Sequence, residues 1–212
     1  MRIAVLCDVH GNLPALEAVL ADVASLEVDR IVCGGDVVAG PFEQECVERL
    51  LEHDAAFVRG NADREVGEPA WLRELPVSLA FGGVRFCHGS PRRDDEILTK
   101  VSPDERFRAA LAGTEEPLVV GGHTHVQFVR TAGATVFANA GSVGRPYEGR
   151  QGAFWALVEG TDVELRRTPY AVDAAVAAIR AARYPDADAL CSTLLEPEDP
   201  DEVSQYFESL AA

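Results

Sequence analysis

The chain has 212 residues, of which 47% are hydrophobic, and its 19 basic and 35 acidic residues give a net charge of −16. This length and composition can bury one sizeable core, so we expect one main domain with room for an appendage. The negative charge would repel a nucleic-acid backbone, and no apolar run reaches the roughly 18 to 20 residues of a membrane-spanning helix. We therefore expect neither nucleic-acid nor membrane partners.

The N-terminus and the cysteines indicate a cytoplasmic protein. The segment from Met1 to Asp8 becomes charged too soon for a secretory signal. The five cysteines are widely spaced and form no Cys-x-x-Cys pair. We expect them to be reduced thiols that are buried in the core.

The first part of the chain alternates between strand and helix patterns. Apolar runs at residues 3–7 and 30–33 predict strands, and amphipathic segments at 14–26 and 42–53 predict helices. Such alternation predicts parallel strands that are joined by helical crossovers. Chemistry is then expected on the loops at the carboxyl ends of the strands.

From residue 77 the pattern changes to hairpins and then to helices. The predicted hairpins pair residues 77–81 with 84–87, 128–131 with 135–138, and 153–159 with 163–167. Helical patterns follow at 172–182, 187–195 and 202–210, with prolines between them. We therefore predict a domain of residues 1–170 and a helical appendage of residues 171–212.

The predicted appendage is acidic, because no Lys or Arg follows Arg183. The simplest interpretation is a solvated surface. Two other roles stay open, namely binding a partner and folding over a functional site as a lid.

Possible metal ligands follow five successive predicted strands. They are Asp8 and His10, Asp36, Asn61, His88, and finally His123 and His125. Residues i and i+2 of an extended stretch project to one side, so Asp8 and His10 can converge on one cation. Four of the five histidines lie in these endings, and only His53, at the end of a predicted helix, does not. This joint placement favours a metal site over isolated structural residues.

The motifs Asp-x-His, Gly-Asp, Gly-Asn, His and Gly-His-x-His, in this order, resemble those of the calcineurin-like metallophosphoesterase superfamily. The resemblance covers roughly residues 1–170. The sequence Asn-Ala-Gly-Ser-Val-Gly-Arg-Pro at 139–146 is similar to a loop of the small bacterial and archaeal phosphodiesterase branch. The resemblance implies an α/β fold, an αββα sandwich of two mixed β-sheets flanked by helices, here followed by the helical appendage.

The resemblance also implies a dinuclear metal site. One cation would be bound by Asp8, His10, Asp36 and His125, and the other by Asp36, Asn61, His88 and His123, with Asp36 as the bridge. Nitrogen and oxygen ligands together suit two divalent transition-metal ions, with Mn as the first choice and Fe, Zn, Ni or Co as alternatives. Water activated by the cations would then attack the phosphorus of a small phosphate-ester substrate.

The third motif departs from the pattern that many relatives share. These relatives have a histidine directly after the asparagine, but this chain has Ala62. Without a general acid there, we expect phosphodiesters to be preferred to alkyl monoesters. Asp63 matches a family carboxylate that orients a neighbouring group, so we expect it to support catalysis.

Four further residues are candidates for contact with the substrate. Arg64 is a catalytic candidate, and Asn12 and Arg145 are candidates for substrate binding. Arg59 is a further guanidinium that could reach the phosphate. The alternative for each arginine is an ordinary surface position.

Two other functions stay open on the sequence alone. A phosphomonoesterase or phosphoprotein phosphatase would share the same dinuclear core. A non-catalytic protein-interaction scaffold, like the retromer scaffold subunit, would share the fold with an altered metal site. All seven predicted ligands are present here, which favours catalysis. The sequence indicates neither the physiological substrate nor the oligomeric state.

Overall fold

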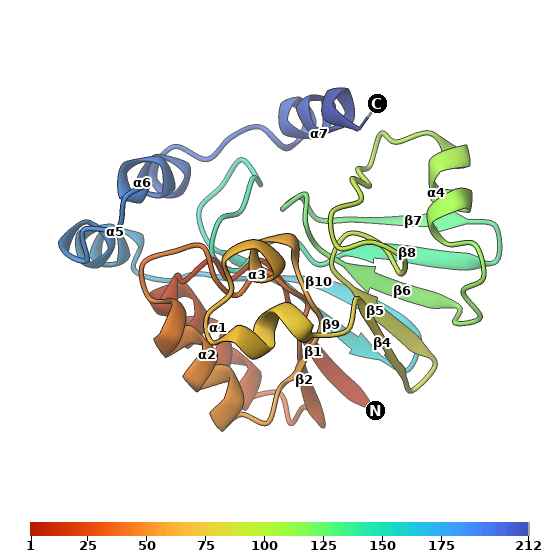
Figure 1. Ribbon diagram of the computed structural model, residues 1–212, viewed down its shortest axis with the longest axis horizontal. Helices are drawn as coiled ribbons and strands as arrows, with labels where there is room; N and C mark the ends of the chain where they lie inside the picture. Colours follow the sequence, from red (N-terminus) through yellow and green to blue (C-terminus); the bar gives the residue numbers. More distant parts are fainter. Residues whose placement is uncertain (212) are drawn as a thin grey trace.

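Two five-stranded sheets form the centre of the computed structural model, which describes residues 1–211 (Figure 1). The first sheet contains, in spatial order, β10 (Asp162–Thr168), β9 (Ala153–Glu159), β1 (Arg2–Leu6), β2 (Arg30–Cys33) and β3 (Ala56–Phe57). The second contains β4 (Ser78–Phe81), β5 (Val84–Cys87), β6 (Leu118–Gly121), β8 (Thr135–Asn139) and β7 (Phe128–Ala132).

Both sheets are mixed, as the family resemblance implied. β1, β2 and β3 run parallel, and the β9–β10 hairpin joins them antiparallel to β1. In the second sheet β5, β6 and β8 run parallel, and β4 and β7 are the antiparallel edge strands. The parallel strands place the carboxyl ends of β1, β2, β5 and β6 along one side of the molecule.

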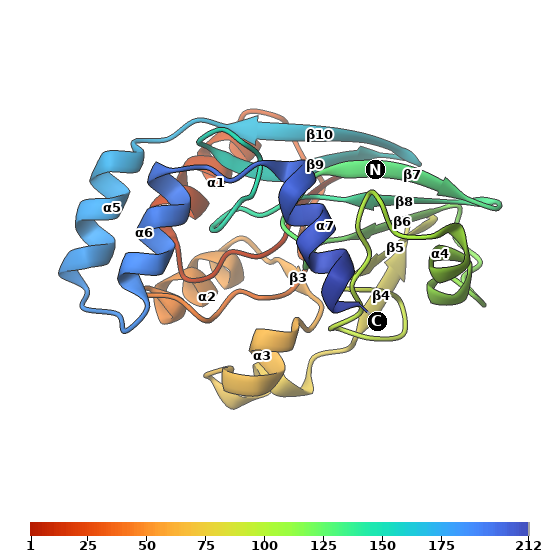
Figure 2. The same cartoon turned by 90° about the horizontal axis from the view of Figure 1, so that it is seen from above.

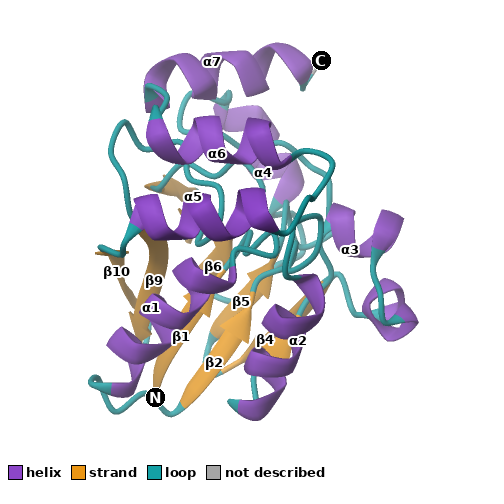
Figure 3. Cartoon of the chain, turned by 90° about the vertical axis from the view of Figure 1, so that its left-hand side faces the viewer, coloured by secondary structure: helices purple, strands orange, loops and turns teal. Residues whose placement is uncertain are grey.

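The side chains of β1 alternate between two apolar cores. Ala4 and Leu6 pack against α1 (Leu13–Ala24) and α2 (Glu43–Glu52), which cover the outer face of the first sheet (Figure 3). Ile3 and Val5 pack in the core between the two sheets. Because successive strand residues point to opposite faces, this double burial accounts for the continuous apolar run.

α4 (Asp104–Ala110) covers the outer face of the second sheet. Its buried Phe107 contacts Phe128 and Phe137, with ring centroids 6.2 and 5.6 Å away. Figure 2 shows α4 on the opposite side of the molecule from α1 and α2. The layers therefore follow the order helix, sheet, sheet, helix, which confirms the predicted αββα sandwich.

The C-terminal segment forms α5 (Val172–Ala181), α6 (Ala187–Leu195) and α7 (Pro200–Leu210). α5 and α6 share a small apolar cluster that Phe42 and Tyr184 extend. An extended segment leads on to α7 (Figure 1). There Glu208 accepts hydrogen bonds from Ser102 at 2.6 Å and Arg106 at 2.7 Å. The helices exist as predicted, while the division at residue 170 stays a prediction and Ala212 lies outside the described residues.

The other predicted elements occur within a few residues of their expected bounds. The short helix α3 (Asn61–Val66), the 3₁₀ turn at Ala70–Glu74 and α4 were not predicted. Within residues 1–211 no helix combines the length and the apolar character that crossing a membrane requires.

Candidate metal centre

The seven predicted ligands come after strands of both sheets, six of them on loops and one in a helix. Asp8 and His10 follow β1, Asp36 follows β2, and Asn61 begins α3 after β3. His88 follows β5 in the second sheet, and His123 and His125 follow β6. Six of the seven, all except Asn61, lie close to one another, as the interatomic and ring distances below show.

Asp8, His10 and His125 form one group of possible ligand atoms. Nε2 of His125 lies 3.1 Å from Oδ1 of Asp8 and 3.2 Å from Nε2 of His10. Nε2 of His10 lies 3.9 Å from the same Asp8 oxygen. Three donor atoms thus face one point, which is the arrangement a cation site needs.

Asp8, Asp36 and His88 form a second group beside the first. Nε2 of His88 lies 3.3 Å from Oδ2 of Asp36 and 3.7 Å from Oδ1 of Asp8. Oδ2 of Asp36 also lies 3.9 Å from Nε2 of His10. Both carboxylates therefore face both groups, so the bridging role of Asp36 stays a prediction. The ring of His123 lies against that of His88, at a centroid distance of 5.0 Å.

Three buried side-chain atoms of the predicted ligands have no hydrogen-bond partner within residues 1–211. They are Oδ1 of Asp8, Oδ1 of Asn61 and Nε2 of His88. A buried polar atom without a partner is costly, so such atoms call for a bound group. All three belong to predicted ligands, and their oxygen and nitrogen character fits divalent transition-metal ions.

Backbone carbonyls orient two of the histidine rings. Nδ1 of His88 lies 2.9 Å from the carbonyl oxygen of Gly34, and Nδ1 of His125 lies 2.6 Å from that of Arg145. A neutral ring that donates from Nδ1 keeps a lone pair on Nε2. Both Nε2 atoms face the site, as metal-binding histidines require.

The carboxylates make the centre electrostatically attractive to cations. Burial opposes a charge on His88, yet the charges of Asp36 and Asp8 raise its pKa to about 10. Burial, with the charge of His125, lowers the pKa of His10 to about 4. The charge that holds a proton on His88 would attract a metal ion in the same way.

The loops that carry the ligands are backbone-strained. Among the residues that the structure describes, nine other than glycine have positive φ. Five of the nine are predicted ligands, namely Asp8, His10, Asp36, His123 and His125. Non-glycine residues adopt this region at an energetic cost, and strain of this kind gathers at functional sites.

Two glycines make room for the carboxylates. A Cβ on Gly60 would lie 2.0 Å from Oδ1 of Asp36, and a Cβ on Gly122 would lie 2.4 Å from Oδ2 of Asp8. Both distances are too short for atoms that are not bonded to each other. Both positions therefore require glycine for the close approach.

Asp63 holds the Asp36 loop in place and does not face the donor atoms. Its carboxylate accepts from the backbone N–H of Asp36 at 2.8 Å, Gly60 at 2.9 Å and Val37 at 3.1 Å. Burial and the nearby charge of Asp36 raise its pKa to about 6. This bonding suits the supporting role expected of Asp63, as a positioning residue.

The predicted arginines differ in their surroundings. Nε of Arg59 donates to Oδ2 of Asp94 at 2.8 Å, and Nε of Arg64 lies 3.1 Å from the same oxygen. By contrast, Nε of Arg145 is buried and has no partner within residues 1–211. Contact of each arginine with substrate stays a prediction. Among the three, Nε of Arg145 is the donor that remains available to a substrate.

The side chain of Asn12 is fully buried and bonded within the protein. It donates to the carbonyl of Gly144 at 2.9 Å and accepts from the N–H of Ala15 at 3.3 Å, which caps α1. It therefore links the first motif to the Gly-Ser loop. Its expected contact with substrate stays a prediction.

Sequence reasoning missed two features of the Gly-Ser loop. The hydroxyl of Ser142 donates to the carbonyl of Asp8 at 2.8 Å and accepts from the N–H of Arg145 at 2.8 Å. The ring of Tyr147 stacks on His125, with centroids 5.1 Å apart and planes 13° from parallel. The Gly-Ser motif marks this loop, but nothing in the sequence marks Tyr147.

Comparison with known proteins identifies the superfamily of the chain. Residues 1–162 match the calcineurin-like phosphoesterase superfamily domain. The chain is 27% identical to the uncharacterized protein MJ0912 of Methanocaldococcus jannaschii over 232 residues, which covers 87% of this chain and 94% of that protein. It is 28% identical to phosphodiesterase YfcE of Escherichia coli K12 over 170 residues, covering 74% and 87% of the two chains.

A solved structure extends the likeness to nearly the whole chain. The crystal structure of a metallophosphoesterase from Sphaerobacter thermophilus superposes with a TM-score of 0.77 and 28% sequence identity. The match covers 93% of this chain and all of that one.

Proposed function

The chain belongs to the calcineurin-like phosphoesterase superfamily, and on this basis we propose that it is a metal-dependent phosphodiesterase with a dinuclear site that hydrolyses a small phosphate ester. One observation carries the proposal. Asp8 and His88, which lie together in one ligand group, each keep a buried atom that has no protein partner within residues 1–211. Such atoms suit cations, and the phosphodiesterase named among the relatives supports the reaction class.

The proposed ligands are Asp8, His10, Asp36, Asn61, His88, His123 and His125. When bound, divalent cations, with Mn as the first candidate, would activate water and offset charge on the phosphoryl oxygens. The carbonyls of Gly34 and Arg145 lie within hydrogen-bond distance of Nδ1 of His88 and His125, and each would accept from a ring whose Nε2 binds a cation. Asp63 fixes the loop of Asp36 through backbone hydrogen bonds.

Arg145 is our candidate for binding the phosphate. Its backbone carbonyl touches His125, so the residue lies beside the first ligand group. Its buried Nε would donate to a phosphoryl oxygen, a charge-assisted bond that is strong in a buried site. Ser142 holds the Arg145 backbone in place.

Two arguments favour diesters and catalysis over the alternatives. Ala62 provides no proton for an alkoxide leaving group, which disfavours a role as a general phosphomonoesterase. The complete set of seven ligand residues disfavours a non-catalytic scaffold, in which we expect the metal site to be altered.

The test is a side-by-side screen of metal-reconstituted protein. Purified protein is first analysed for bound metal and then assayed on bis(p-nitrophenyl) phosphate and p-nitrophenyl phosphate. We expect about two bound cations per chain and a higher kcat/KM on the diester. Protein that binds cations but hydrolyses neither ester would contradict the proposal.

A further inference from the structure

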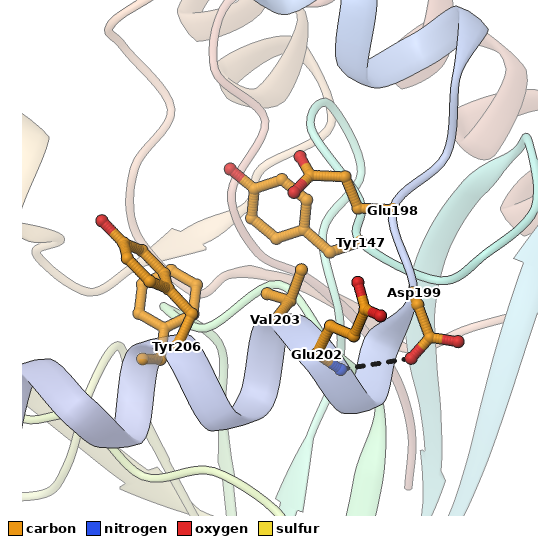
Figure 4. Close-up of a pocket in the computed structure, with 7 residues that line it drawn as sticks. Tyr147, Glu198, Asp199, Glu202, Val203 and Tyr206 are labelled. Carbon is orange, nitrogen blue, oxygen red and sulfur yellow. Dashed lines mark hydrogen bonds between the residues drawn. The ribbon is translucent and has the colours of Figure 1, made fainter.

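A cavity of about 410 Å³ lies between the loop of Tyr147 and the C-terminal helix α7 (Figure 4). Tyr147 forms one wall, and the other comes from α7 and the segment before it, through Glu198, Asp199, Glu202, Tyr206 and Phe207. This volume suits a small organic group. Neither the predicted metal ligands nor the arginines discussed above line it.

The cavity begins one aromatic ring away from the metal centre. The ring of Tyr147 that lines the cavity also stacks on the predicted ligand His125. Phe207 lies 6.3 Å from Tyr147 between ring centroids, and Tyr206 lies 6.0 Å from Phe207. A group attached to a phosphate at the centre would therefore meet an aromatic wall.

The position of α7 is supported by polar contacts with the body of the protein. Glu208 binds Ser102 and Arg106, and Lys100 pairs with Asp201. The backbone N–H of Gly149 also donates to the carbonyl of Glu198 at 2.8 Å. The cavity wall is thus held at both ends of the helix.

The lining is negatively charged and contains no Lys or Arg among its described residues. Asp199 accepts from the N–H groups of Asp201 and Glu202 as the cap of α7. Within residues 1–211 the carboxylates of Glu198 and Glu202 form neither a hydrogen bond nor an ion pair. Unpaired carboxylates and aromatic faces both attract cations, so an anionic group would be repelled and an organic cation stabilised.

We propose that this cavity binds the ester group of the substrate and selects a group that carries an organic ammonium, an inference that rests on the proposed phosphodiesterase activity. The anionic phosphate would occupy the metal centre. The ammonium would lie against the rings of Tyr206 and Phe207 and be neutralised by Glu198 and Glu202.

Two diesters with the same leaving group test the charge preference. They are p-nitrophenylphosphorylcholine and ethyl p-nitrophenyl phosphate. In each, water breaks the bond from phosphorus to the aryl oxygen, and p-nitrophenol leaves while the phosphate keeps the other ester. We expect kcat/KM to be at least about fivefold higher for the choline ester, a factor typical of one cation–aromatic contact.

Variants of the lining assign the preference to this cavity. In the double variant Glu198→Gln/Glu202→Gln the ratio of choline to ethyl ester efficiency should fall to near one, and Tyr206→Ala should lower it in part. The matched control is Glu105→Gln, at an exposed position of α4, which should keep the parent ratio. A ratio near one in the parent protein, or a parent-like ratio in the double variant, would overturn the inference.

A binding measurement separates this inference from the proposed function. Saturation-transfer NMR on the methyl protons of choline is recorded with chelator-treated protein and with the double variant. We expect transfer in the parent and its loss in the double variant. Choline transfer without hydrolysis of any diester would keep the subsite and reject the activity. Diester hydrolysis without choline transfer or choline preference would do the reverse.

Discussion

The backbone N–H of His123 donates to Oδ2 of Asp8 at 3.0 Å and thereby joins the two sheets at the metal centre. This bond leaves Oδ1 of Asp8 facing the histidines without a protein partner among residues 1–211. The two carboxylate oxygens of Asp36 also have different roles. Oδ1 accepts from the N–H of Ala62 at 2.8 Å, while Oδ2 faces His88. The backbone therefore orients both carboxylates independently of a cation.

Removal of metal should abolish activity. Protein treated with a chelator and then desalted is expected to lose diester hydrolysis, and added Mn should restore it, because the orphaned oxygen and nitrogen atoms of the centre require cations. Activity is followed on bis(p-nitrophenyl) phosphate, with metal content measured in parallel. Full turnover in protein shown to be metal-free would reject the mechanism.

Replacing Asp36 should be more damaging than replacing Asn61. Oδ2 of Asp36 faces both His10 and His88, whereas Asn61 offers one neutral oxygen. We expect Asp36→Ala to lower turnover by more than about a hundredfold and Asn61→Ala by about tenfold to a hundredfold. Metal content and circular dichroism are measured for both. Parent-like metal content and turnover in Asp36→Ala would show that Asp36 is not the bridge.

His53 should be dispensable for metal binding. It lies at the C-cap of α2, where its imidazole can favour the helix end through the dipole, and it belongs to neither ligand group. His53→Ala is expected to keep the metal content and turnover of the parent. A folded His53→Ala protein that has lost much of its metal would mean that the ligand set is incomplete.

Glu148 should make stability depend on pH. Burial raises the pKa of this carboxyl from 4.5 to about 7, so folding favours its protonated form. The resulting stability is present below about pH 4.5 and is lost as the pH rises through 7. Glu148→Gln, which keeps an acceptor for the N–H of Gln127, should raise Tm by a few degrees at pH 8 and by little at pH 5. An unchanged Tm at pH 8, measured beside the control Glu105→Gln, would contradict this.

The convergence of five of the candidate ligands, Asp8, His10, Asp36, His88 and His125, could be predicted because each follows an apolar strand in a recognisable motif. Parallel strands end at one edge of a sheet, so side chains such as Asp8 and Asp36 meet there whatever the details of the loops. The apolar faces of the longer helices are periodic, which explains why α1, α2, α5, α6 and α7 were also predicted.

The features that the sequence did not predict are short helices and contacts between distant segments. α3 and α4 have six and seven residues, too few for an apolar period to be distinguished from a loop. The stacking of Tyr147 on His125 depends on the path of a loop, and the cavity wall depends on where α7 docks. Loop shape and docking follow from packing across the whole chain, which local patterns do not encode.

The absence of an imidazole at position 62 should determine which esters are hydrolysed. Ala62 is buried in the first turn of α3, and its N–H holds Oδ1 of Asp36. A simple alkoxide leaving group needs a proton, and a positioned acid contributes about a hundredfold to ten-thousandfold in rate. Aryl esters leave more readily without one. We therefore expect efficient hydrolysis of bis(p-nitrophenyl) phosphate, weaker hydrolysis of p-nitrophenyl phosphate and little hydrolysis of glycerol phosphate.

The variant Ala62→His tests whether that missing imidazole is the cause. The new imidazole would extend from a residue whose N–H bonds Asp36. The variant should raise kcat/KM on glycerol phosphate selectively, while kcat/KM on the aryl diester, which needs no proton donor, rises less. Metal content and Tm are checked first, because a larger side chain at a buried position can disturb the N–H that holds Asp36. If the parent protein already hydrolyses glycerol phosphate as efficiently as the aryl diester, another group supplies the proton and the explanation based on Ala62 is wrong.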